Sequence, residues 1–266
     1  MHGTVTDLYF YPIRGLSAQR LDAVSVGPDR GFPLDRCWAL PTRNGEYRTV
    51  RDRPLGSGNV HGPTMDPRLA GVATSFDPES EWLEVRVQDH LVLACSLASE
   101  GGVAEAEEFF ARVLDLEPED RPHLVRRADA GYNFAYTASV STSLTWACHV
   151  VNLASVRDLE ERIGRPVDPL RFRANLYVDL GEPWIENDLL GRTFRVGDVQ
   201  LRGEMATARC AATEVSLETA ERDIPIPRLL MTHYGHTDFG IYANILTEGE
   251  LRPGMDVAAT AAEDAL

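Results

Sequence analysis

Short apolar segments of strand length dominate the first part of the chain. Val5–Tyr11 is an apolar and aromatic segment that ends at Pro12, and Leu21–Val26 alternates apolar with polar residues before a Gly-Pro turn. Further segments of this kind are Arg36–Leu40, Leu69–Phe76, Trp82–Val87 and Leu91–Ala94. Several short strands at near-regular spacing predict a barrel or a sandwich.

Two segments instead repeat their apolar residues with the period of a helix. In Val103–Leu114 the apolar side chains fall on one face, and glutamates lie early, where the helix dipole favours acids. Val150–Arg162 is predicted as a second helix, with Asn152 or Ser155 as its N-cap and Gly164 at its end.

Strands return in the last third of the chain. Thr193–Val196 and Val199–Arg202 flank a Gly-Asp pair that is typical of a tight hairpin. Ile224–Tyr234 predicts a short helix. The other predicted strands are Leu176–Leu180, Ile241–Leu246 and Met255–Ala258.

These elements predict an α+β chain that is mostly β, with a few helices. We place one β-rich part at residues 1–115 and a second at 116–258, with the boundary in the loop after the first helix. Residues 259–266 are small and acidic, and we expect this tail to fray.

Composition excludes several kinds of chemistry. All 26 basic residues are arginine. Without lysine the chain cannot form an internal aldimine with pyridoxal phosphate, and it has no P-loop. Anionic ligands must then bind to arginine forks, backbone N–H groups or hydroxyls. The net charge of −15 argues against nucleic acid and anionic membrane as partners.

Targeting signals and cysteine spacing point to the cytoplasm. The N-terminus has no basic segment followed by an apolar one, and no apolar run approaches the ~20 residues of a membrane span. The four cysteines contain no CxxC pair, which speaks against a zinc site or a disulfide framework. We expect a reducing, cytoplasmic environment.

Cys210 is the strongest candidate for chemistry. It lies in the run TARCAAT (207–213), beside a guanidinium and with a threonine on each side. A thiolate is a soft metal ligand and a strong nucleophile, and a neighbouring cation favours it. The alternative is a buried structural thiol, which is the default for a free cysteine.

Arginines form a second group of candidates. If the segment RFRAN (171–175) is extended, Arg171, Arg173 and Asn175 share one face and can clamp an anion. A solvated strand edge explains the same residues equally well. Arg14 precedes Gly15, which lets a backbone N–H approach an anion or simply forms a strand-exit turn.

Two other clusters are less specific. Glu182, Glu186 and Asp188 have oxygen ligands suited to a hard metal, although loop solvation explains them better. His233 and His236 are a close pair without a third ligand placed by the sequence, which favours a surface position.

Motifs in both halves of the chain form a specific set through their order and spacing. In the first half they are YPIRGL (11–16) and GFPLDRCW (31–38). In the second half they are RFRAN (171–175), END (186–188) with Gly191, VGD (196–198), TARC (207–210) and FGIY (239–242) with Gly254. This set resembles the MOSC family, named after the C-terminal part of molybdenum-cofactor sulfurase, over nearly the whole chain.

The resemblance implies a fold and a set of site residues. It implies an N-terminal β-barrel-like domain packed on a MOSC β-barrel domain. It also implies that Cys210 ligates molybdenum held by a pterin dithiolene. The residues that it places around the molybdenum-pterin cofactor are Arg14, Gly15, Arg36, Arg171, Asn175, Ala208, Arg209 and Tyr242.

The resemblance further implies an oxidoreductase that reduces N-oxygenated compounds. Its partners would be a small-molecule substrate and a separate electron-transfer protein of ferredoxin or cytochrome type, or a partner that delivers the cofactor. Two alternatives stay open. In the first, Cys210 carries sulfur as a persulfide, or the protein uses Cys210 to carry and deliver the cofactor. In the second, the chain is a small-molecule binding module that has lost the metal.

Overall fold

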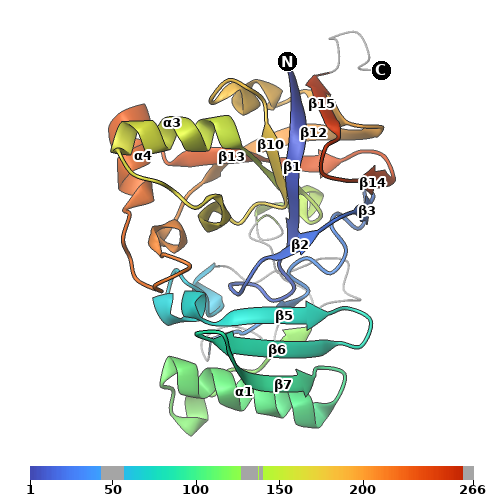
Figure 1. The fold of residues 1–266 in the computed structure, drawn as a ribbon. Helices are drawn as coiled ribbons and strands as arrows, with labels where there is room; N and C mark the ends of the chain where they lie inside the picture. The colour runs from blue at the N-terminus through green and yellow to red at the C-terminus, as the bar shows by residue number, and fades with distance from the viewer. Residues whose placement is uncertain (43–56, 127–136, 138–139, 260–266) are drawn as a thin grey trace.

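The computed structural model describes residues 1–42, 57–126, 137 and 140–259 (Figure 1). The predicted tail lies outside these residues beyond its first position. Within them the fold is mostly β with three α-helices, so the predicted fold class is confirmed. None of the described helices combines the length and the apolar character that a bilayer crossing requires.

A closed barrel is the larger part of the fold, and both ends of the chain contribute to it. Its strands are β1 (His2–Phe10), β9 (Cys148–Asn152), β10 (Leu176–Asp179), β11 (Thr193–Val196), β12 (Val199–Ala208), β13 (Asp238–Ile245) and β15 (Asp256–Ala259). They follow one another in the order β10-β9-β13-β12-β11-β15-β1, and β1 pairs with β10 to close the ring. Only β9 and β10 pair in parallel, and the helix α3 (Leu153–Ile163) connects them.

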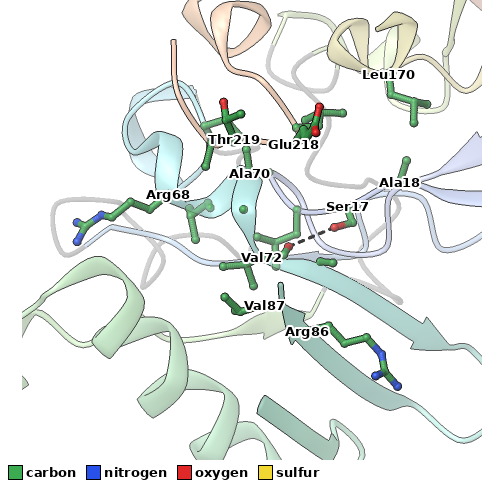
Figure 2. A pocket seen from close by; sticks show the side chains of 18 of the residues that line it. Ser17, Ala18, Arg68, Ala70, Val72, Arg86, Val87, Leu170, Glu218 and Thr219 are labelled. Carbon is green, nitrogen blue, oxygen red and sulfur yellow. Dashed lines mark hydrogen bonds between the residues drawn. The ribbon is translucent and has the colours of Figure 1, made fainter. Parts of the chain in front are cut away.

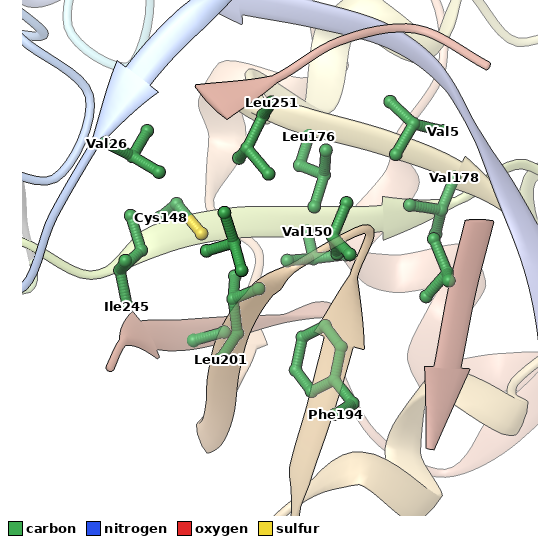
Figure 3. Close-up of a cluster of buried hydrophobic side chains, with 14 of the residues drawn as sticks. Val5, Val26, Cys148, Val150, Leu176, Val178, Phe194, Leu201, Ile245 and Leu251 are labelled. Atoms are coloured by element: carbon green, nitrogen blue, oxygen red, sulfur yellow. The ribbon is translucent and has the colours of Figure 1, made fainter. Parts of the chain in front are cut away.

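Apolar side chains from all sides of the barrel fill its interior (Figure 3). Val5 on β1, Val150 on β9 and Leu201 on β12 are among the almost fully buried members of this cluster. Burial of one such side chain is worth about 1.5–3 kcal/mol, which makes the barrel a stable support for the segments at its ends.

A smaller unit packs beside the barrel (Figure 1). It consists of an antiparallel sheet of β5 (Ala73–Asp77), β6 (Trp82–Val87) and β7 (His90–Ser96), with α1 (Glu100–Leu114) against it. The remaining described strands and helix are β2 (Gln19–Leu21), β3 (Val24–Val26), β4 (Trp38–Ala39), β8 (Val125–Arg126), β14 (Gly249–Leu251) and α4 (Ile226–Tyr234).

The start of the second predicted helix was wrong. Val150 and Val151 belong to the strand β9, and α3 begins only at Leu153. Both valines are fully buried, and a strand buried on both faces shows no apolar–polar alternation in its sequence. Asn152 is confirmed as the N-cap, because its side chain accepts a hydrogen bond from the Ala154 amide at 3.1 Å.

Glu186 is a fully buried carboxylate held by neutral donors. Asn152 Nδ2 donates to it at 2.9 Å and Ser155 Oγ at 2.7 Å. Burial raises the pKa of Glu186 above its ordinary value, against the opposing effect of these hydrogen bonds. The carboxylate therefore ties the loop before β11 to α3.

We expect Glu186 to make the protein less stable as the pH rises. Its folded-state pKa is raised, so its favourable contribution is complete below its unfolded-state pKa and is lost as the pH rises through the folded-state value. The melting temperature of the wild type relative to Glu186→Gln should then fall between pH 4 and pH 8, as followed by circular dichroism. A difference that is independent of pH would contradict this expectation.

Candidate functional site

Cys210 lies at the surface, two residues after the end of the barrel strand β12. It precedes a short 3-10 helix, Ala211–Glu214, whose first turn donates back to the Cys210 carbonyl from the Thr213 hydroxyl at 2.9 Å. Of the four cysteines, all in the described part of the chain, Cys210 is exposed and the other three are buried. The structure thus excludes the alternative that Cys210 is a buried structural thiol.

Arg209 is fixed beside this thiol by backbone carbonyls. Its Nε donates to the Phe239 carbonyl and its Nη1 to the Phe172 carbonyl, both at 3.0 Å. Its Nη2 contacts Nε2 of His149, and burial together with nearby arginines holds the pKa of His149 well below its usual range. Burial also lowers the pKa of Arg209 to about 10, so the guanidinium still carries its charge at neutral pH.

The guanidiniums of Arg36 and Arg173 both lie over the aromatic ring of Tyr11. Their guanidinium carbons lie 4.6 and 4.4 Å from the ring centroid of Tyr11, which is within the range of cation–π attraction. Arg36 forms an ion pair with Asp35 and donates to the Arg173 carbonyl at 3.0 Å. The Nη2 atom of Arg173 is buried and has no hydrogen-bond partner.

Arg14 belongs to the same electrostatic environment. Burial, together with the charges of Arg36 and Arg173, lowers the pKa of Arg14 to about 10, against the opposing effect of Tyr242 and Cys210. We call Arg14, Arg36, Arg173 and Arg209 the arginine cluster. The positive charges of these arginines repel one another, and an anion bound among them would offset this electrostatic cost.

The segment that holds Arg171 and Arg173 is not extended. Pro169–Phe172 forms a 3-10 helix and Arg173 adopts a left-handed conformation with φ 53°, so the two guanidiniums do not share a strand face. Arg171 instead forms a fork with Asp223 at 2.7 and 2.8 Å. Both of its Nη atoms are therefore committed to an internal ion pair, although its buried Nε has no hydrogen-bond partner, while Arg173 lies in the cluster.

Asn175 and Tyr242 both contact His149, which in turn contacts Arg209 of the cluster. The Asn175 side chain accepts from the His149 amide at 3.1 Å and donates to the Tyr9 carbonyl at 3.2 Å. The ring of Tyr242, on β13, lies 5.1 Å from that of His149, and burial raises the pKa of Tyr242. These contacts place His149, which the sequence analysis did not single out, between Arg209 and Tyr242.

Gly15 and Ala208 are the two small residues among the predicted site residues. Gly15 has φ +87°, and a Cβ there would lie 2.8 Å from the His61 carbonyl oxygen, so only glycine fits without strain. Ala208 is exposed and ends β12 next to Arg209.

A cavity of ≈ 720 Å³ lies beside the smaller unit (Figure 2), and its lining includes Arg173 of the arginine cluster but not Cys210. Tyr11, Gly15 and Arg173 contribute to its lining, together with Leu170 and Thr219 from the second half of the chain. Arg173 therefore borders open space of the size of a small-molecule site.

Comparison with known protein families covers most of the chain. A model described as MOSC N-terminal beta barrel domain matches residues 2–117, and one described as MOSC domain matches residues 137–258. The chain belongs to the MOSC family. The resemblance inferred from the motifs is thus confirmed.

Individual relatives of this MOSC protein carry two kinds of name. It is 26% identical over 285 residues to mitochondrial amidoxime-reducing component 1 of Mus musculus, covering 96% of this chain and 82% of the relative. It is 37% identical over 256 residues to molybdenum cofactor sulfurase of Drosophila mojavensis, covering 90% of this chain and 31% of the relative. The YUAD protein of Bacillus subtilis, a solved structure, aligns at TM-score 0.44 with 11% identity, over 97% of this chain and 96% of that one.

Proposed function

We propose that this MOSC protein binds a molybdenum-pterin cofactor and reduces N-oxygenated small molecules with molybdenum ligated by Cys210. The observation that carries the proposal is an exposed thiol in electrostatic contact with Arg14 and Arg209, while Arg14 in turn interacts with Arg36 and Arg173. The relatives associate the family with the molybdenum cofactor, since they are named as amidoxime-reducing components and molybdenum cofactor sulfurases. The reaction class and the role of Cys210 are our inference.

The residues present fit this cofactor. Its phosphate carries negative charge, and arginine forks bind phosphate through paired charge-assisted hydrogen bonds. The partnerless, buried Nη2 of Arg173 supplies a free donor, and Gly15 lets the backbone approach closely. A thiolate is a ligand that softer metals prefer.

Each group of the chain has a defined task in this proposal. Arg14, Arg36 and Arg173 bind the phosphate, and Arg209 places positive charge beside the sulfur. His149 stays neutral and accepts from Arg209, and Asn175 and Tyr242 hold this arrangement in place. When bound, the cofactor would supply two-electron transfer to the substrate.

The proposal includes a partner and a location. A separate ferredoxin-type or cytochrome-type protein would deliver the electrons, and a cofactor-delivery partner would load the site. Cytoplasmic residence stays a prediction from the cysteine pattern; the Mus musculus relative is named as mitochondrial.

A second candidate function is sulfur transfer. The exposure of Cys210 also suits a persulfide, and some relatives are named molybdenum cofactor sulfurase, although the chain spans only 31% of the Drosophila mojavensis sulfurase. A persulfide carrier would contain sulfane sulfur that cyanide removes.

Metal and pterin analysis of the purified protein tests the proposal. After expression in a host that makes the cofactor, we expect stoichiometric molybdenum and the fluorescent oxidised pterin. If the protein lacks both but releases thiocyanate on cyanolysis, the reductase proposal is wrong and the sulfur-carrier function is supported instead.

A further inference from the structure

Residues 61–66 of the first half of the chain lie against Cys210. The Thr64 hydroxyl is 3.4 Å from the Cys210 sulfur, a contact across 146 positions of sequence. The two family models that meet here cover different halves of the chain, so this contact joins them. We call residues 61–66 the Thr64 wall.

Both ends of the Thr64 wall are anchored. The His61 amide donates to the Leu40 carbonyl at 2.7 Å, and Asp66 caps the following 3-10 helix by accepting from the Arg68 amide at 3.0 Å. In between, the Met65 amide closes a turn onto the Gly62 carbonyl at 2.9 Å. The wall is thus a fixed element of the site.

Arg222 ties the middle of the wall to the segment that carries Cys210. One guanidinium nitrogen donates to the Thr64 carbonyl at 2.8 Å and the Pro63 carbonyl at 3.2 Å. The other donates to the Ala211 carbonyl at 2.6 Å, directly after Cys210, and to Glu214 at 3.3 Å. One side chain therefore sets the separation between wall and sulfur.

We propose that the Thr64 wall, positioned by Arg222, determines the size of the group that can reach the Cys210 sulfur and any substrate bound there. The role in substrate selection rests on the proposed function, whereas the restriction on access to the sulfur does not. Thr64 is the specificity-determining residue, and Arg222 is a positioning residue that acts through it.

Alkylation of Cys210 in cofactor-free protein measures this restriction directly. The other three cysteines are buried, so labelling mapped by mass spectrometry reports on Cys210 and also reveals any unfolding. Iodoacetamide serves as the small probe and N-(1-pyrenyl)maleimide as the bulky one. The readout is the ratio of the two rates at a fixed pH.

Arg222→Met removes the hydrogen bonds of both guanidinium nitrogens and should raise the bulky-to-small ratio about tenfold or more, because even one charged hydrogen bond is worth about that factor. Arg228→Met, which removes an exposed arginine on α4, is the matched control and should leave the ratio unchanged. Thr64→Phe should act in the opposite direction and slow both probes, while Thr64→Ser should behave as wild type. Opposite effects from two variants of one wall cannot both come from destabilisation.

An unchanged ratio in Arg222→Met together with unchanged rates in Thr64→Phe would overturn the proposal. These outcomes do not depend on the cofactor. If the wild type binds stoichiometric molybdenum but the variants leave the labelling ratios unchanged, the proposed function stands and the proposed role of the Thr64 wall is wrong. If the wild type lacks molybdenum but the variants change the ratios as expected, the role of the wall stands and the proposed function is wrong.

Discussion

Replacing Cys210 by alanine is expected to remove nearly all bound molybdenum and to leave the fold intact. The side chain is exposed, so its truncation opens no cavity in the core. Loss even of residues that merely support metal ligands costs about 10–100-fold in metal affinity, and loss of a ligand should cost at least as much. Elemental analysis and a thermal melt of the same sample measure both effects.

Cys95→Ala is the matched control for this variant. Cys95 is buried between the small sheet and α1, away from the arginine cluster, so its truncation should lower the melting temperature and keep molybdenum bound. Full retention of molybdenum by Cys210→Ala would contradict ligation by this sulfur. Molybdenum that is lost equally from both variants would point to a general effect on folding.

Arg173→Gln is expected to strip the pterin without unfolding the protein. Burial lowers the pKa of Arg173, and the charge of Arg36 lowers it further, so the folded protein bears a cost for this guanidinium. Replacement by Gln removes the buried charge, so the fold should not lose stability from its absence. It also removes the proposed contact to the cofactor phosphate. Pterin fluorescence per folded chain should fall by about tenfold or more, since a charge-assisted hydrogen bond contributes roughly 1.5–3 kcal/mol.

Arg171→Gln should show the opposite pattern. Arg171 is buried and its fork with Asp223 links two segments, so breaking it should cost about 3 kcal/mol of stability. Pterin per folded chain should stay near the wild-type level. If Arg171→Gln loses pterin and Arg173→Gln keeps it, the phosphate is bound by the arginine that the family resemblance indicated, and our assignment from the structure is wrong.

Local signals in the sequence were sufficient for many elements of the fold. The hairpin at Gly197, the N-cap at Asn152 and the helix ending at Leu114 each follow from residues that interact within a few positions. The strand β9 was missed because its alternation is erased by burial on both faces. Its environment depends on α3 and the barrel, which local sequence does not reveal.

The candidate site was predicted only as far as single motifs reach. Cys210 could be found from its polar neighbours, and Arg14, Arg36 and Arg209 from family motifs. The choice between Arg171 and Arg173 depended on a backbone turn at position 173 and on a distant acid, Asp223. The roles proposed for His149, Thr64 and Arg222 rest on contacts between segments far apart in the chain, which no local pattern encodes.

The pairing of β1 has a consequence for the order in which the protein is made. His2 pairs with Ala258, and Leu8 with Leu176, so β1 needs partners that are synthesised long after it. The small sheet and α1 are contiguous in sequence and can fold during synthesis, because their contacts are local. The barrel can close only after β15 has been synthesised, and until then the part of β1 that pairs with β10 and β15 lacks its full set of partners and would be covered by nascent-chain chaperones.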